Sequence, residues 1–304
     1  MKSIVQLRHP DAKPVPFLSI AYLTREGYTH AYIDISYSIA MALSNYLYLD
    51  GIVQSSLPLY PLLRHPWMRR LWLRLAYGAA KLFFRLCCQV HIEGSEHIPS
   101  QGGVVLVSNH ISGFDTLLLP YSVLAAQGMQ IIWAPAKAEL FRSRLLSSLL
   151  TPLGVFPVRR GQHDRQAMRR MIAHMRTEKM MLFPEGTRSR DGRLHEGKRT
   201  VGKLIYTARP VVIPAAIVGT ERIMSHLKSL VHGRAPVSLH YGKPLALQHY
   251  YAMPDTKETA VAIVQEVMSA IAALLYNASQ PVETGSVRPI PAGSQGTDHG
   301  SSID

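Results

Sequence analysis

Residues 103–115 read GVVLVSNHISGFD, and they join a predicted strand to a pair of polar side chains. The apolar run over residues 103–107 predicts a buried strand. It ends just before Asn109 and His110, and Asp115 follows after a four-residue link. A strand end holds an imidazole rigidly, and the short link can fold Asp115 back onto it. The carboxylate would then orient His110 as a general base, although a histidine at this place could also be a structural cap of the next helix.

Strand-like and helical segments alternate around this stretch. The expected strands span residues 103–107, 130–134, 155–158, 180–183, 211–218 and 236–241. The expected helices span residues 114–126, 137–150, 164–177, 198–208 and 256–277. This alternation predicts an α/β fold with a mainly parallel central sheet covered by helices.

Residues 67–88, WMRRLWLRLAYGAAKLFFRLCC, precede the alternating region and form an expected amphipathic helix. At about 100° per residue, the side chains of Arg70, Arg74, Lys81 and Arg85 fall on one side, and Trp, Phe and Leu occupy the others. Four charges argue against a bilayer span and favour a membrane-facing helix in the headgroup region. A surface helix with its apolar side in the core is equally compatible with the pattern.

The remaining segments complete the expected domain organisation. Residues 1–66 are expected to be a partly ordered N-terminal extension. Within it, residues 35–49 are expected to form a helix at an interface or against the body, because they fall short of the roughly 20 residues of a spanning helix. The globular part would be one domain over residues 67–278, which includes the amphipathic helix at 67–88. Residues 279–304, rich in Pro, Gly and Ser, are expected to be a disordered tail.

The charge of the chain points to an anionic partner. There are 33 Lys and Arg residues against 20 Asp and Glu, which gives a net charge of +13. Nucleic acid, anionic lipid and phosphorylated metabolites would all fit such an excess. The cations are scattered, without interleaved stacking aromatics, which argues against nucleic acid. The adjacent Cys87 and Cys88 are unsuited to ordinary cross-linking and fit a reducing compartment, and the first residues lack the apolar run of a signal peptide.

Arginines follow two further strands of the expected sheet. Arg159 and Arg160 come after residues 155–158, and Arg188 closes the string FPEGTR after the strand at 180–183. Because the carboxyl ends of parallel strands converge on one crevice, these arginines are expected near His110. The planar guanidinium fork suits phosphate, although any one of them could be a solvated loop cation.

The string FPEGTR also supplies three candidate binding residues beside Arg188. Gly186, next to Thr187, lets the backbone approach a ligand closely because it has no Cβ. Glu185 could accept a hydrogen bond from a substrate hydroxyl or orient Arg188 as an ion-pair partner, and the orienting role is the favoured one.

Taken in order, NHxxxxD, the VRRG strand end, FPEGTRS and the VIP strand resemble the motifs of the glycerolipid acyltransferases. The similarity is greatest to the 1-acylglycerol-3-phosphate (lysophosphatidic acid) acyltransferases and covers roughly residues 75–245. NHxxxxD alone is a weak signal, but its combination with FPEGTRS is specific. After FPEGTRS the chain departs from the family pattern, and Lys198 and Gly202 are the matches that remain.

The resemblance implies a reaction and a role for each site residue. His110 would remove the proton of the acceptor hydroxyl, Asp115 would hold its tautomer, and the oxygen would attack the thioester directly. Arg160 and Arg188, with Arg159 beside them, would anchor the glycerol phosphate, in a pocket shaped by Glu185, Gly186 and Thr187. The product would be phosphatidic acid. No metal or cofactor is implied, and the co-substrate would be an acyl-CoA or acyl carrier protein thioester.

The expected partners are a lysophospholipid acceptor, the thioester donor and an anionic membrane surface, with no nucleic acid. The enzyme would lie, as a peripheral or monotopic protein, on the cytoplasmic face of a membrane. Glycerol 3-phosphate, another lysophospholipid or an acylated amino acid could replace the acceptor, and a non-catalytic membrane-binding protein is a further alternative. A hydrolase that uses Ser108 or Cys87 is disfavoured, since neither lies in a Gly-x-Ser-x-Gly elbow.

Overall fold

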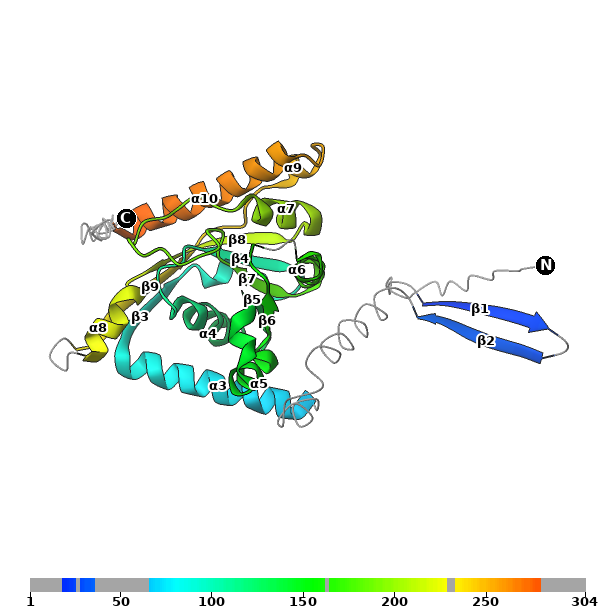
Figure 1. Ribbon diagram of the computed structural model, residues 1–304, viewed down its shortest axis with the longest axis horizontal. Coiled ribbons are helices and arrows are strands. Elements are labelled where there is room, and N and C mark those ends of the chain that lie inside the picture. The colour runs from blue at the N-terminus through cyan, green and yellow to red at the C-terminus, as the bar shows by residue number, and fades with distance from the viewer. Residues whose placement is uncertain (1–17, 26–27, 36–65, 162–163, 229–232, 280–304) are drawn as a thin grey trace, which may run out of the picture.

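The computed structural model describes residues 18–25, 28–35, 66–161, 164–228 and 233–279. Within these ranges one sheet has seven strands, in the order β3-β9-β8-β4-β7-β5-β6 (Figure 1). The strands are β3 (Cys88–Glu93), β4 (Val104–Ser108), β5 (Ile132–Lys137), β6 (Val155–Val158), β7 (Lys179–Leu182), β8 (Val211–Val218) and β9 (Ala235–Tyr241). The strand of the opening motif, β4, is therefore at the centre.

The sheet is mainly parallel, which confirms the predicted fold class. β4 pairs in parallel with β7 and β8, and β5 pairs in parallel with β6 and β7. β9 runs antiparallel to β8, and β3 is parallel to β9 at the edge. Pro214, the proline of the VIP string, lies inside β8 opposite Val107, and the strand continues to Val218.

The sequence prediction missed the edge strand β3, because the apolar run of the preceding helix continues into it. Cys87 and Cys88 were both expected at the end of a helix, but in the structure they belong to different elements. The helix α3 (Pro66–Cys87) ends at Cys87, and β3 begins at Cys88. Side chains of β3 alternate between buried and more exposed positions, as expected of a strand paired on one side.

Helices cover both faces of the sheet (Figure 1). One face carries α3, α4 (Asp115–Gln127) and α8 (Ile223–Lys228), and the other carries α6 (Arg165–Thr177), α7 (Arg199–Ala208) and α10 (Lys257–Ser279). Val104 and Leu106 of β4 pack toward the first layer, and Val105 and Val107 toward the second. This alternation gives the domain two apolar cores with β4 buried between them. The short helices α5 (Arg144–Leu150) and α9 (Gln248–Tyr251) complete the set.

The helix α3 has apolar side chains on two sides. Its inner side contributes Phe84, which is fully buried against the sheet, and Trp72, whose Nε1–H donates to the carbonyl of Leu149. The outer side carries a stripe of leucines and a tryptophan that are about half exposed or more: Trp67, Leu71, Leu75, Leu82 and Leu86. The helix therefore packs on the body and still presents an apolar stripe to its surroundings. The surface helix with its apolar side in the core is thereby confirmed, and contact of the helix with a membrane stays a prediction.

The basic residues of α3 lie beside this outer apolar stripe. Arg70, Arg74, Lys81 and Arg85 are all exposed, and each directly precedes a leucine of the stripe. The outer surface of α3 is therefore amphipathic along its length, with a half-exposed apolar stripe and a row of cations beside it.

The long helix α10 is apolar and long enough to cross a membrane, alone among the described helices. It packs instead against α7 and β8, and its residues Ile263, Val267 and Ile271 are fully buried. At the α7 contact, a Cβ on Gly202 would lie 1.9 Å from the carbonyl oxygen of Ala260. Glycine at this position is therefore required by the close approach of the two helices.

An antiparallel hairpin of β1 (Leu18–Arg25) and β2 (Tyr28–Ile35) lies in the N-terminal extension. The composition of this segment did not predict strands. The helix expected within residues 35–49 and residues 280–304 of the expected tail lie outside the described residues, whereas Ser279, the expected first residue of the tail, is the last residue of α10.

Candidate active site

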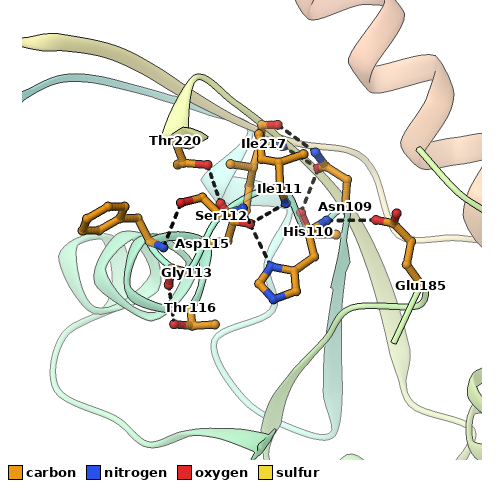
Figure 2. A network of polar contacts seen from close by, with 12 residues as sticks. Asn109, His110, Ile111, Ser112, Gly113, Asp115, Thr116, Glu185, Ile217 and Thr220 are labelled. Atoms are coloured by element: carbon orange, nitrogen blue, oxygen red, sulfur yellow. Dashed lines mark hydrogen bonds and ion pairs between the residues drawn. The ribbon is translucent and has the colours of Figure 1, made fainter. Parts of the chain in front are cut away.

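His110 and Asp115 are in direct contact at the carboxyl end of β4. The Nδ1 atom of His110 lies 2.8 Å from Oδ2 of Asp115, as the short link between them predicts (Figure 2). The backbone N–H groups of Ile111 and Ser112 donate to the same oxygen, at 2.8 and 2.7 Å. An oxygen that faces two N–H donors is an acceptor for the imidazole too, so Nδ1 carries the proton. The other ring nitrogen, Nε2, then has a free lone pair, as a general base requires.

The carboxylate of Asp115 is held at the start of a helix. Asp115 is the first residue of α4, where the helix dipole stabilises a negative charge, and it is completely buried. Its second oxygen, Oδ1, accepts a hydrogen bond from the hydroxyl of Thr220, just beyond β8. Four donors therefore fix this side chain, and through it the plane of the His110 ring. The His110 side chain is 11% exposed, which leaves it reachable at the surface of the site.

Asn109 anchors the motif to the neighbouring strand. Its amide Nδ2 donates to the carbonyl of Ile217, and its Oδ1 accepts from the N–H of the same residue, both at 2.8 Å. The side chain thereby extends the hydrogen-bond ladder between β4 and β8 by two bonds. His110 is thus presented on rigid backbone.

Glu185 has a role different from the one favoured by the sequence. Its Oε1 accepts from the backbone N–H of His110 at 3.0 Å, and its Oε2 accepts from the N–H of His195 at 3.1 Å. Across the described residues, no ion pair joins it to Arg188. The buried carboxylate therefore orients the backbone of the histidine and of its own loop. The expectation that it orients Arg188 was wrong, because both oxygens face backbone N–H groups.

Residues of the FPEGTRS loop also contact His110, in addition to Asp115. The ring of Phe183 stacks on the imidazole of His110 at 4.0 Å between centroids, with 15° between planes. The N–H of Ser189 donates to the carbonyl of His110 at 2.7 Å. The His110 backbone is therefore hydrogen-bonded on both its N–H and its carbonyl by residues of one loop.

Gly186 makes the tight turn of this loop, and Thr187 follows it at the surface. Gly186 has φ +72°, and its N–H donates to the carbonyl of Phe183. A Cβ at Gly186 would lie 3.3 Å from the side chain of Lys198, which covers the turn. Thr187 is exposed. The turn thus brings Thr187 and the following arginine to the open side of the site.

The structure brings one of the predicted arginines to the histidine motif. Arg188 is exposed, and its Nη1 lies near Gly113 of the His–Asp link, where an added Cβ would be 3.8 Å away. Arg159 and Arg160 are exposed beyond β6, and β6 is the third strand from β4. At about 4.8 Å per strand this is a separation of about 14 Å. Arg188 is therefore a neighbour of the pair, and Arg160 lies farther along the same rim.

Three further residues of the site were not selected from the sequence: Asn109 as a cross-link, Ser189 and Thr220. Thr220 directly follows Val218 and Gly219 at the carboxyl end of β8, the same rim that carries the other motifs. Its position at the end of an expected strand was the signal by which the sequence could have identified it. Only the strand order shows that this end faces Asp115.

Neither proposed alternative nucleophile is arranged for attack. Ser108 is fully buried, and its hydroxyl donates to Oδ1 of Asn109. The other candidate, Cys87, is the last residue of α3 and packs, partly buried, against the apolar core. In the part of the chain that the structure describes, no three His, Cys, Asp or Glu side chains are grouped as metal ligands.

The comparison with known proteins points in the same direction as these contacts. Residues 89–218 match the model of the Acyltransferase family. A chloroplastic 1-acyl-sn-glycerol-3-phosphate acyltransferase of Arabidopsis thaliana, LPAT1, is 30% identical over 164 residues, which are 52% of this chain and 44% of the relative. The enzyme of the same name from Borreliella burgdorferi is 28% identical over 44% of this chain and 52% of its own length. The chain spans about half the length of these curated relatives.

A solved structure shares the fold. The crystal structure of the 1-acyl-sn-glycerophosphate acyltransferase PlsC from Thermotoga maritima superposes with a TM-score of 0.50 and 22% identity, and covers 78% of this chain and 94% of that one. The matched residues 89–218 include the His110–Asp115 pair and the whole FPEGTRS loop. Residues 89–218 are thus similar to the Acyltransferase family, in agreement with the resemblance of the motifs.

Proposed function

We propose that the protein transfers an acyl group from a thioester to the free hydroxyl of a 1-acylglycerol 3-phosphate and so forms phosphatidic acid. The observation that carries this proposal is the His110–Asp115 contact, in which Asp115 holds the proton on Nδ1 and leaves Nε2 as the base. The relatives are named as 1-acyl-sn-glycerol-3-phosphate acyltransferases, which supports this choice of acceptor.

The reaction proceeds in one displacement. Nε2 of His110 takes the hydroxyl proton of the acceptor while the oxygen attacks the thioester carbonyl. The tetrahedral intermediate then loses the thiolate as the C–S bond breaks, and the imidazolium returns the proton to the sulfur. A thioester is already activated, so a general base and the alignment of two bound substrates supply the acceleration. Asp115 stabilises the imidazolium while it exists.

The rim arginines position the acceptor. Arg188 lies next to the His–Asp link, and Arg160, with Arg159, lies farther along the carboxyl edge of the sheet. A phosphate held between them places the glycerol hydroxyl near Nε2. Gly186 and Thr187 form the backbone wall on this side.

The outer surface of α3 brings this site to its lipid substrate. Its apolar stripe inserts among lipid tails at the membrane surface while the adjacent cations contact anionic headgroups. We infer a peripheral or monotopic placement on the cytoplasmic face, with α3 as the contact. No bound metal or cofactor takes part in the proposed reaction.

The decisive experiment is an acyl-transfer assay with the full chain and a panel of acceptors: lysophosphatidic acid, glycerol 3-phosphate, other lysophospholipids and an acylated amino acid. Lysophosphatidic acid should give the highest kcat/KM. His110→Ala should lower kcat by about 10²–10⁴-fold. Asp115→Asn should do the same, because the side-chain amide can donate a hydrogen bond to Nδ1 of His110 and so stabilise the wrong tautomer of the imidazole. The exposed His249→Ala is the matched control and should keep full activity.

Two results would contradict the proposal. Near wild-type transfer by folded His110→Ala would remove the assigned base. Binding to vesicles without transfer to any acceptor by the wild-type chain would instead identify a non-catalytic membrane protein.

A further inference from the structure

A cavity lined by arginines lies where the outer surface of α3 ends. It has a volume of about 690 Å³ and opens between the C-terminal end of α3, the β3–β9 edge and the segment after β8. Its lining includes three arginines from three different segments: Arg85, Arg222 and Arg234. No acidic side chain is among its lining residues in the described part of the chain. A cavity with this lining favours an anionic ligand.

The three arginines can donate hydrogen bonds to such a ligand. Arg85 is exposed, and Arg222 pairs with its neighbour Glu221 at 3.2 Å in an exposed ion pair. A pair of this kind contributes little stability, so a phosphate can replace the carboxylate as the partner of Arg222. Arg234 donates through Nη1 to the carbonyl of Arg85 at 3.1 Å, which ties the segment before β9 to the end of α3. A guanidinium has five N–H donors, so this bond leaves Arg234 with donors for a ligand.

The floor of the cavity is closed, and the groups that it offers to a ligand are mainly polar. Phe84, Cys88 and Val237 belong to the lining but are almost completely buried, so they offer little apolar surface. Gln89 and Ser238 add an amide and a hydroxyl to the lining. A phosphate ion would fill only part of the volume, and these two side chains can hydrogen-bond to hydroxyl groups attached to it. The cavity therefore suits a small polar group that carries a phosphate.

Exposed apolar side chains occur on both helices next to the cavity. Leu82 and Leu86 of the α3 stripe are exposed, and α8 adds the exposed Met224 and Leu227. Residues three or four positions apart lie on the same side of a helix, so each pair forms one apolar surface. α8 begins directly after Arg222 and contacts α3, and Figure 1 shows it beside the C-terminal end of that helix. The cationic cavity is thus bordered by apolar surfaces that acyl chains can contact.

We propose that this cavity binds the headgroup of an anionic glycerophospholipid, with the lipid phosphate between the three arginines and the acyl chains along the apolar surfaces of α3 and α8. The substituent on the phosphate is uncharged, because an ammonium group would face three guanidinium groups without a carboxylate partner. Phosphatidylglycerol, whose headgroup carries hydroxyls, meets these requirements.

The bound lipid is an anchor and takes no part in the reaction. The fully buried side chains of Thr220 and Asp115 lie between this cavity and the His110 imidazole (Figure 2). The inference goes beyond the proposed reaction and rests only on the membrane contact of α3. It adds a site that recognises one headgroup to a surface that otherwise attracts any anionic membrane.

The test is flotation of the full chain with two kinds of vesicle that carry the same net charge. One contains phosphatidylcholine with phosphatidylglycerol, and the other contains phosphatidylcholine with the same share of phosphatidylserine. The wild type should bind the phosphatidylglycerol vesicles about tenfold more tightly, because the ammonium of phosphatidylserine is repelled. Arg85→Gln/Arg222→Gln should lose this preference and keep its Tm, since both side chains are exposed and Arg234, which ties α3 to β9, is retained.

The matched control is Arg70→Gln/Arg74→Gln, which removes two exposed charges from the same helix outside the cavity. This variant should bind both kinds of vesicle more weakly and retain the preference for phosphatidylglycerol. Equal binding of the two vesicles by the wild type, or a preference that survives in the cavity variant, overturns the inference.

Calorimetry with soluble probes separates a lipid headgroup from a free anion. Short-chain phosphatidylglycerol, below the concentration at which it forms micelles, should bind the wild type about tenfold more tightly than the cavity variant. Inorganic phosphate should bind the wild type more weakly than this lipid does. Equal affinity for the two probes would assign the cavity to a free anion and overturn the inference. If the lipid preference depends on the cavity arginines but no acceptor is acylated, the proposed function fails while the headgroup site stands.

Discussion

The hydroxyl of Thr220 donates a hydrogen bond to Oδ1 of Asp115 and thereby links the end of β8 to the histidine motif at the end of β4. Both residues are fully buried. Since the other carboxylate oxygen is occupied by His110 and two backbone N–H groups, Thr220 is the remaining side chain that sets the rotation of the carboxylate.

Thr220→Val should therefore weaken catalysis through the orientation of Asp115. The change keeps the shape but removes the donor, and a lost hydrogen bond to a buried charge costs about 1–3 kcal/mol. We expect a fall in kcat of about tenfold, with little change in either KM and a lower Tm. Thr220→Ser restores the hydroxyl and should recover most of the activity. Equal kcat for the valine and serine variants would show that the contact has no positioning role.

Replacement of the rim arginines should act on the acceptor. Arg188→Gln is expected to raise the acceptor KM by about tenfold or more, because a charge-assisted contact to phosphate is lost. Arg160→Gln should act in the same direction but less, since β6 is the third strand from β4. The exposed neighbour Arg190→Gln serves as the control. Steady-state titration of lysophosphatidic acid at saturating donor measures the effect, and unchanged acceptor KM in both variants would exclude the phosphate anchor.

The outer surface of α3 offers a separate test by vesicle flotation. Leu71→Ser/Leu75→Ser should reduce membrane binding at every salt concentration, because each leucine is about half exposed and contributes apolar area to the bilayer contact. Arg70→Gln/Arg74→Gln should reduce binding to anionic vesicles at low salt and have little effect at high salt or on neutral vesicles. Binding that is undiminished in both pairs would place the membrane contact elsewhere.

The contact between α7 and α10 predicts a stability difference between two glycines. Gly202→Ala introduces a Cβ 1.9 Å from a backbone oxygen of α10, so the helices must separate. Overpacking of this kind typically costs about 1–3 kcal/mol, or several degrees of Tm for a domain of this size. Gly78→Ala on α3 has no atom within 4 Å of the new Cβ and should be neutral or stabilising by up to about 1 kcal/mol. Thermal unfolding compares them, and similar Tm values would contradict the close approach.

Local patterns were sufficient for most of the elements. The apolar run before Asn109 became the central strand β4, and the six expected strands and four of the five expected helices lie within a few residues of the predicted ranges. The helix expected over residues 137–150 is instead a 3-10 helix at Ala138–Arg142 followed by α5. The edge strand β3 was missed because an apolar helix runs directly into it, and a short half-buried strand has little periodicity of its own. Pairing with β9, nearly 150 residues away in the chain, defines it.

The His110–Asp115 contact was determined by the sequence itself, because the two residues are five positions apart at a strand end and a helix start. The roles of Glu185 and Thr220 were decided only by tertiary structure. Their partners, the His110 backbone and the Asp115 carboxylate, lie 75 and 105 residues away, and only the order β8-β4-β7 brings them together. Short-range spacing specifies a contact within one motif, whereas the pairing of distant strands determines which motifs become neighbours.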